Sequence, residues 1–401
     1  MFSNLPPLAD DPILNTALKF QADERTHKMD LSVGVYRNAQ GVTPVMQAIR
    51  EAQKTHIANE TTKVYQGMAG NLEFCALVND LVMGPMHNER VKSVQSVGGT
   101  GALRILSDLI KVGKPNCTVW VPNPTWANHG AIIQAAGLAQ KTYRYFDADT
   151  MQVNVPAMLE DLATAGPNDA VILHGCCHNP TGAELSPQDW DKIAALAEKN
   201  GFLPFVDLAY MGFAEGLEAD VYGVRKIAAH VPRMLVSASC SKNFGIYRER
   251  TGCAIIMGEN AGEADFSKKT LMQRVRENYS MPPSHGASLV IEILRDAALR
   301  RVWEEELDSI RNRINGLRRD LAAALRQRTN SDRFDFIERQ RGMFSLLGTN
   351  VDDVAYLQDI HAIYAVGAGR INIAGLSEEL IPPFADALVD TISANVGGNS
   401  E

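Results

Sequence analysis

Six short apolar runs between residues 93 and 257 constrain the fold of this chain more than any other feature. In chain order they read SVQSV, CTVWV, AVILH, LPFVDL, MLVSAS and GCAIIM. They are rich in Val, Ile and Leu and do not alternate between polar and apolar residues, which indicates strands buried on both faces. The segments between them are long enough for crossover helices. The runs therefore predict an α/β protein with a doubly wound, mainly parallel sheet.

The rest of the chain predicts a second, smaller domain. At about 150 residues per domain, a chain of 401 residues corresponds to roughly two or three domains. The segment 287–328 is rich in Arg and Glu, with Leu and Ile at helical spacing, which predicts one or two long helices that leave the large domain. We expect an extended arm over 1–12, a small α+β domain built from 13–45 and 300–401, and a large domain over 46–299.

Composition excludes several classes of protein. The chain has 39 basic and 47 acidic residues, so its net charge is −8, and no basic field is available to hold a nucleic acid. It has neither a basic and apolar leader nor an apolar run of about 18 residues, so we expect a cytoplasmic protein without membrane contact. None of the six cysteines shows C-x-x-C spacing, and we expect reduced, mostly buried thiols.

Polar residues that follow the apolar runs are the candidates for chemistry, because ligands of open α/β sheets bind beyond the carboxyl ends of the strands. The glycine-rich turn 98–101 could hold an anion at a helix N-terminus, although this motif taken alone favours a plain strand-to-helix turn. Asn179 follows AVILH in a turn, where it could bind a ligand or form an Asx turn. His174 and His178 flank two cysteines, but the surrounding Gly and Pro predict a strand and a turn, so we expect no metal.

Three further residues follow the last parallel strands. Asp207 is the last residue but one of LPFVDL, and a buried acid at that place needs a cationic partner, either an Arg or a ligand nitrogen. Tyr210 could reach the same ligand or could serve in packing. Lys242 follows MLVSAS and a run of small hydroxyl residues, which favours a position in the ligand cleft, although most lysines near strand ends are merely exposed.

Seven segments together resemble the aspartate and aromatic amino-acid aminotransferases. They are GGTGALR, NPTWANH, LHGCCHNPTG, VDLAYMGFAEGLE, SASCSKNFGIYRERTG, RENYSMPPSHG and GRINIAGL, and they occur in the order and spacing of that family. The similarity also covers DPIL at 11–14 and VGVY at 33–36, and so extends over nearly the whole chain. It implies the aspartate aminotransferase fold, with 46–299 as the cofactor-binding domain, and pyridoxal 5′-phosphate as cofactor.

The resemblance implies a role for each residue of the cofactor site. Lys242 matches the lysine that binds the cofactor covalently and moves the substrate proton. Asp207 matches the carboxylate that pairs with the ring nitrogen, with His129 behind it, and His174 is placed in the same region. The remaining matched residues bind the phosphate, the phenolic oxygen or the ring face of the cofactor: Gly99, Thr100, Gly101, Ser239, Arg250, Ser241 as a weaker candidate, Tyr210, Asn179, Trp126, and Tyr65 from a neighbouring subunit.

Two arginines match the residues that bind the substrate in this family. Arg370 corresponds to the residue that binds the α-carboxylate, in a corner completed by Gly34, Trp126 and Asn179. Arg276 corresponds to the residue that crosses a dimer interface to bind the distal carboxylate of aspartate or glutamate. The resemblance therefore implies a homodimer with shared active sites.

The leading hypothesis is an aminotransferase of amino-acid metabolism that exchanges an amino group between aromatic amino acids or aspartate and 2-oxoglutarate. A dedicated aspartate aminotransferase is the main alternative, since Arg276 occurs in both groups of relatives. A pyridoxal-phosphate lyase or decarboxylase on the same fold is disfavoured by the two arginines. A binding protein without enzymatic activity is disfavoured by the presence of Lys242, Asp207 and Arg370 together.

Overall fold

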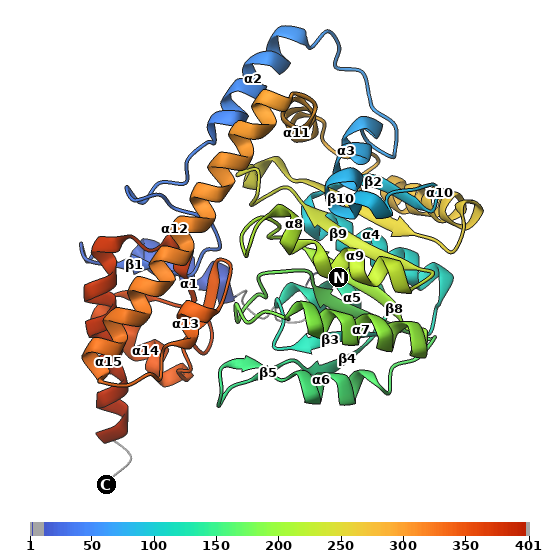
Figure 1. Ribbon diagram of the computed structural model, residues 1–401. Coiled ribbons are helices and arrows are strands. Elements are labelled where there is room, and N and C mark those ends of the chain that lie inside the picture. The colour runs from blue at the N-terminus through green and yellow to red at the C-terminus, as the bar shows by residue number, and fades with distance from the viewer. Residues whose placement is uncertain (1, 3–11, 398–401) are drawn as a thin grey trace. The chain divides into compact units, whose positions relative to one another are not determined.

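The protein divides into two compact units in the computed structural model, which describes residue 2 and residues 12–397 (Figure 1). We call them unit 1 and unit 2. Unit 1 comprises Met1–Thr43, Pro180–Gly182 and Ile314–Glu401, and unit 2 comprises Pro44–Asn179 and Ala183–Arg313.

Unit 2 is built on a seven-stranded sheet. Its strands are β2 (Val91–Val97), β3 (Thr118–Asn123), β4 (Ala139–Arg144), β7 (Asp169–His174), β8 (Leu203–Leu208), β9 (Met234–Ser239) and β10 (Thr251–Met257). Their order is β2, β10, β9, β8, β7, β3, β4. β10 is antiparallel to both of its neighbours, and the other pairings are parallel. The mainly parallel sheet is confirmed, and each of the six apolar runs forms one of its strands.

β4 is the strand that the apolar pattern does not reveal. Its sequence AQKTYR is polar, and only Tyr143 is buried. β4 lies at the edge of the sheet and pairs only with β3, in parallel register. An edge strand needs less apolar surface than a central one, so polarity does not prevent its pairing.

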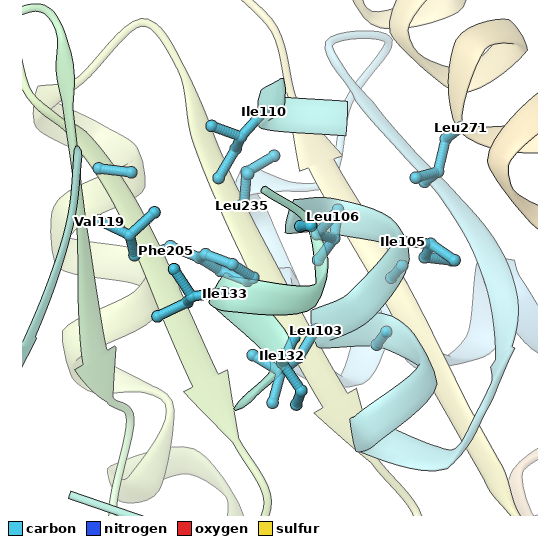
Figure 2. Close-up of a cluster of buried hydrophobic side chains, with 14 of the residues drawn as sticks. Leu103, Ile105, Leu106, Ile110, Val119, Ile132, Ile133, Phe205, Leu235 and Leu271 are labelled. Carbon is cyan, nitrogen blue, oxygen red and sulfur yellow. The ribbon is translucent and has the colours of Figure 1, made fainter. Parts of the chain in front are cut away.

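Helices surround this sheet. They are α2 (Gln47–Asn59), α3 (Leu72–Met83), α4 (Gly98–Gly113), α5 (Asn128–Ala135), α6 (Val155–Leu162), α7 (Pro187–Asn200), α8 (Leu217–Asp220), α9 (Tyr222–His230), α10 (Ala261–Asn278) and α11 (His285–Arg295). Figure 2 shows the main core cluster, in which Leu103, Leu106 and Ile110 of α4 pack with Ile133 of α5 and Phe205 of β8. This packing fixes the start of α4 against the carboxyl end of the sheet.

Unit 1 is an α+β unit that joins both ends of the chain. It contains α1 (Pro12–Ala22), β1 (Met29–Asp30), α13 (Phe336–Arg339), β11 (Phe344–Leu346), α14 (Val351–His361), β12 (Ile363–Tyr364), β13 (Arg370–Asn372) and α15 (Ile381–Gly397). β1 pairs in parallel with β12, and β11 pairs antiparallel with β13. The N-terminal segment and the tail therefore form one unit. The expected arm over 1–12 lies outside the described residues apart from Phe2 and Pro12.

One continuous helix, α12 (Ala297–Thr329), contains the point where unit 2 ends and unit 1 begins. α11 and α12 account for the expected long helices. The domain boundaries expected from the sequence, at 45/46 and 299/300, stay predictions. The two compact units of the structure are divided at Thr43/Pro44 and at Arg313/Ile314. All six cysteines lie in the described part of the chain, where they are buried and form no disulfide bond. Within residues 12–397, no helix is long and apolar enough to cross a lipid bilayer.

Candidate active site

Glycine brings the start of α4 close to the end of β9. Gly98 has φ of 65°, and a Cβ atom on it would lie 2.5 Å from Nη2 of Arg250. A Cβ atom on Gly99 would lie 3.1 Å from Cβ of Ser239. No side chain caps α4, whose first turn contains Gly99, Thr100 and Gly101. Backbone N–H groups and the positive end of the helix dipole at such a start favour the binding of an anion.

Three side chains complete this anion site. Arg250 has φ of 51° in the left-handed region, and its Nη1 donates hydrogen bonds to the carbonyl oxygen of Tyr247 at 2.7 Å and to Oγ of Ser241 at 3.4 Å. The backbone N–H of Ser241 donates to Oγ of Ser239 at 3.2 Å. A guanidinium and two hydroxyl groups therefore gather beside the start of α4, as expected for a phosphate site.

Lys242 lies directly beyond this anion site. The pKa of Lys242 is lowered to about 8, chiefly because its ammonium is buried; the charge of Asp207 opposes this shift, and the charge of Arg250 contributes to it. Its Nζ atom lies 4.7 Å from the ring centroid of Tyr210. A lysine with this pKa is available as a neutral amine near physiological pH, which is what a nucleophile or a base requires.

Asp207 is held in a chain of hydrogen bonds. His174 of β7 stands beside it in the parallel register of β7 and β8. Nε2 of His129 lies 3.2 Å from Oδ2 of Asp207, and Nδ1 of the same ring lies 2.8 Å from Oγ1 of Thr125. Oγ1 of Thr125 also lies 3.2 Å from Nε2 of His174. Sequence reasoning missed Thr125, although it belongs to the NPTWANH segment.

The charges around Asp207 keep it ionised. Burial by itself raises the pKa of the carboxyl group, but the hydrogen bond with His129 and the electrostatic effects of His129 and Lys242 outweigh burial, so the pKa is lowered. Burial and the neighbouring His178 and His129 hold the pKa of His174 well below its usual value. Asp207 is therefore a buried carboxylate that can pair with a cationic ring nitrogen.

Two further predicted residues are in this unit. Trp126 packs against the core, and its ring meets the ring of His129 edge-on at 5.4 Å between centroids. Asn179 is buried and follows β7, beyond Cys177, which has φ of 52°. A non-glycine residue in the left-handed region is costly, and such strain occurs preferentially near functional sites.

Tyr65 and Arg276 differ from the other predicted residues because they are exposed. The side chain of Tyr65 is 89% exposed. Arg276 lies in the last turn of α10, where its Nη1 donates to Oγ of Ser280 at 2.8 Å. The prediction that both serve a neighbouring subunit stays a prediction.

In unit 1, Arg370 and Gly34 meet at one aromatic ring. Arg370 is buried, its Nη2 donates to the carbonyl oxygen of Ser32 at 2.7 Å, and its guanidinium lies 4.5 Å from the ring centroid of Phe344. A Cβ atom on Gly34 would lie 2.6 Å from Cζ of the same ring, so a larger residue there would displace the ring. Phe344 is a functional candidate that sequence reasoning missed.

Asn372 holds the segment that contains Gly34. Its Nδ2 atom donates to the carbonyl oxygens of Val33 at 2.8 Å and Val35 at 2.7 Å. Arg370 and Asn372 are the ends of β13, so one short strand positions both the guanidinium and the backbone beside it. A guanidinium fixed on an aromatic ring is suited to bidentate binding of a carboxylate.

Comparison with known proteins identifies the family. The profile of aminotransferase class I and II matches residues 26–388. The chain is 45% identical to the aromatic-amino-acid aminotransferase of Paracoccus denitrificans, over 97% of this chain and 99% of the relative. It is 41% identical to the aspartate aminotransferase of Haemophilus influenzae, over 98% and 100%.

Solved structures agree with this result. An aromatic amino acid aminotransferase with 3-indolepropionic acid superposes with a TM-score of 0.94 at 45% identity, over 97% of this chain and 99% of the other. An aromatic-amino-acid aminotransferase from Burkholderia pseudomallei, covalently bound to pyridoxal phosphate, gives a TM-score of 0.94 at 37% identity, over 98% and 99%. The chain therefore belongs to the class I and II aminotransferases, pyridoxal-phosphate enzymes of the aspartate aminotransferase fold.

Proposed function

We propose that this aminotransferase transfers the amino group of aromatic amino acids and of aspartate to 2-oxoglutarate. The observation that carries the proposal is the grouping in unit 2 of an amine of lowered pKa, a buried carboxylate and an anion site. These are Lys242, Asp207 and the start of α4 with Arg250.

The residues of unit 2 fit the chemical groups of pyridoxal phosphate. Its phosphate needs hydrogen-bond donors, which the first turn of α4, Ser239, Ser241 and Arg250 supply. Its ring nitrogen needs an anion, and Asp207 is kept ionised. Its carbonyl carbon needs an amine, which Lys242 supplies close to Asp207 and Arg250. We assign Tyr210 and Asn179 to the phenolic oxygen, Trp126 to the ring face, and Tyr65 of a second copy to the phosphate.

Each side chain then has a defined task. When bound, the cofactor withdraws electrons from Cα of the amino acid and so makes the Cα proton acidic. Lys242 would accept this proton at Nζ and would then donate it from the same atom, so that one amine serves both as base and as acid. Asp207 holds the positive charge of the ring nitrogen throughout, and His129 and Thr125 keep its carboxylate oriented.

We assign the substrate α-carboxylate to Arg370, with Gly34, Trp126 and Asn179 as its surroundings. The support for this assignment is the fixed guanidinium of Arg370 on the ring of Phe344. Desolvated, bidentate arginine pairs are among the strongest charge-assisted hydrogen bonds in proteins. Binding at this end orients every substrate in the same way, so specificity is left to the distal side chain.

The names of the relatives support the use of both substrate classes. Relatives at 45% and 41% identity are named as an aromatic and an aspartate aminotransferase. A Psychrobacter aromatic amino acids aminotransferase, 33% identical with a TM-score of 0.94, was cocrystallised with aspartic acid.

We further propose a cytoplasmic location for this protein.

Kinetics on two substrates test this specificity. In the wild type, aspartate and phenylalanine should each shift the visible absorbance band of the bound cofactor. Both should also sustain turnover with 2-oxoglutarate. In Arg276→Leu, kcat/KM for aspartate should fall by at least about tenfold, because a carboxylate pair with arginine contributes roughly 1.5–3 kcal/mol. The value for phenylalanine should change little, since its ring forms no such pair.

Arg274→Leu is the matched control, because Arg274 lies on the same helix and pairs with Glu277 at 2.7 Å. This variant should leave kcat/KM unchanged for both aspartate and phenylalanine. A wild type without activity on phenylalanine would identify a dedicated aspartate aminotransferase. Equal losses on both substrates in Arg276→Leu would remove Arg276 from the specificity argument. Loss of CO₂ or of a side-chain group instead of amino transfer would indicate a decarboxylase or lyase.

We also propose a homodimer whose active sites combine residues of both copies, with Tyr65 and Arg276 acting on the neighbouring copy. Its support is the exposure of Tyr65 together with three other large apolar side chains nearby in the sequence, those of Ile57, Val64 and Leu72. An inactive Lys242→Ala chain reassociated with an inactive chain that lacks both Tyr65 and Arg276 should regain about half of the normal activity per heterodimer, because one intact site forms. Verified heterodimers without activity would show that each site is built within one chain.

A further inference from the structure

The loop that follows Tyr210 is folded around one buried carboxylate. Asp220, the last residue of α8, is 5% exposed. Its oxygens accept four backbone hydrogen bonds, two on Oδ2 from Gly212 at 2.8 Å and Ala214 at 3.0 Å, and two on Oδ1 from Glu215 at 2.8 Å and Gly216 at 3.2 Å. One side chain therefore sets the course of the loop, and it belongs to none of the groups assigned above.

The conformation of this loop needs such support. Gly212 has φ of 95° and Gly216 has φ of 126°, so the backbone turns twice through a region that other residues rarely adopt. Four N–H groups that point inward would each lose a hydrogen bond without the carboxylate. Asp220 thus holds the loop at four backbone positions.

The same loop begins at the phenol that faces the reactive lysine. The N–H of Phe213 donates to the carbonyl oxygen of Tyr210 at 3.0 Å, which joins Tyr210 to the turn. Gly212 and Ala214, on either side of Phe213, are bound to Asp220. The ring of Tyr210 in turn lies 4.7 Å from Nζ of Lys242. Displacement of the loop would therefore move the phenol relative to the amine.

We propose that Asp220 is a positioning residue. By organising the loop between Tyr210 and Asp220, it holds the phenol of Tyr210 at its place beside Lys242. The proposal rests on the proposed function, in which Tyr210 binds the phenolic oxygen of the cofactor. Asp220 can act in this way because a carboxylate offers two oxygens to two pairs of donors. An asparagine offers one oxygen, and its NH₂ group would oppose the second pair.

The test compares Asp220→Asn, Tyr210→Phe and the double variant by pH titration of the visible absorbance of the holoenzyme. The charged groups that shift the pKa of Lys242 are Asp207 and Arg250, and the ring of Tyr210 lies against its Nζ atom. Loss of the phenol hydroxyl in Tyr210→Phe should raise the midpoint by on the order of one pH unit. Asp220→Asn should shift it in the same direction, and the double variant should shift it no further than Tyr210→Phe alone.

Hydrogen exchange provides a second readout in the protein without cofactor. The amide hydrogens of the peptide 211–217 should exchange faster in Asp220→Asn than in the wild type. In Tyr210→Phe their exchange rate should be unchanged. Asp189→Asn is the matched control: this carboxylate accepts hydrogen bonds from the backbone and hydroxyl of Ser186 at the start of α7. It should lose stability without any change in the titration midpoint.

Three outcomes would overturn the proposal. An unchanged midpoint in folded Asp220→Asn, or fully additive shifts in the double variant, would refute positioning while leaving the role of Tyr210 intact. An unchanged midpoint in Tyr210→Phe would refute the role of Tyr210 in the proposed function, and the proposal with it. If Asp220→Asn does not fold, Asp220→Glu replaces it. That variant keeps the charge but moves the carboxylate by one methylene, and it should shift the midpoint in the same direction. An unchanged midpoint in Asp220→Glu would refute the proposal.

Discussion

Replacement of Lys242 by alanine is expected to abolish amino transfer, with a loss of at least about 10⁴-fold in kcat. Alanine removes both the amine that binds the cofactor and the base that takes the Cα proton, and alanine has no group to replace either. The lowered pKa of Lys242, about 8, is the feature that distinguishes this amine from an ordinary exposed lysine. Steady-state kinetics with aspartate, phenylalanine and 2-oxoglutarate measure the loss.

Borohydride reduction of the wild-type holoenzyme followed by peptide mapping identifies the attached lysine. We expect the label on Lys242 only and none in Lys242→Ala. The control is Lys192→Ala, since Lys192 is an exposed residue paired with Asp189 at 3.0 Å, and this variant should retain full activity and labelling. A label on a different lysine of the wild type would disprove the assignment.

Replacement of Asp207 by asparagine should give a folded protein that has lost on the order of 10²- to 10³-fold in kcat. The amide has nearly the shape of the carboxylate, so it can still meet His129, which lies 3.2 Å from Oδ2. It carries no charge, however, and cannot hold a positive ring nitrogen. Circular dichroism checks the fold, and single-turnover absorbance measurements report the chemical step.

Asp191→Asn is the surface control for this variant. Asp191 accepts a hydrogen bond from the hydroxyl of Tyr222 at 2.7 Å and pairs with Lys226 at 3.1 Å, without a predicted role in catalysis. Its replacement should leave kcat unchanged. If kcat of Asp207→Asn stayed within a factor of about three of the wild type, the charge of Asp207 would not be needed for transfer.

The central sheet could be predicted because its signal is local. A strand buried on both faces must be apolar over consecutive residues, and LPFVDL coincides with β8 from Leu203 to Leu208. Asp207 stood out for the same reason, as a charge within such a run. β4 escaped the prediction because an edge strand can be polar, and its identity as a strand comes from pairing with β3.

The candidate site was predictable residue by residue only where family segments carry it. Lys242, Asp207 and Arg370 are recognisable in SASCSKNFG, VDLAY and GRINIAG. What surrounds them was not recognisable, because a single hydrogen bond or ring contact leaves no periodic pattern in the chain. Thr125 between two histidines and Phe344 beneath Arg370 belong to this second group.

The amino-acid sequence by itself thus determined the six buried strands of the central sheet, the apolar core and the chemical types of the reacting groups, since each depends on residues that are neighbours in the chain. Only the tertiary structure decided the properties that depend on distant groups. The pKa of Lys242 depends on burial and on Asp207, 35 positions earlier in the numbering (242 − 207 = 35). The orientation of Arg370 depends on Ser32, 338 positions away. Electrostatic and hydrogen-bond energies follow distance in space, and that distance is set when the sheet and helices pack.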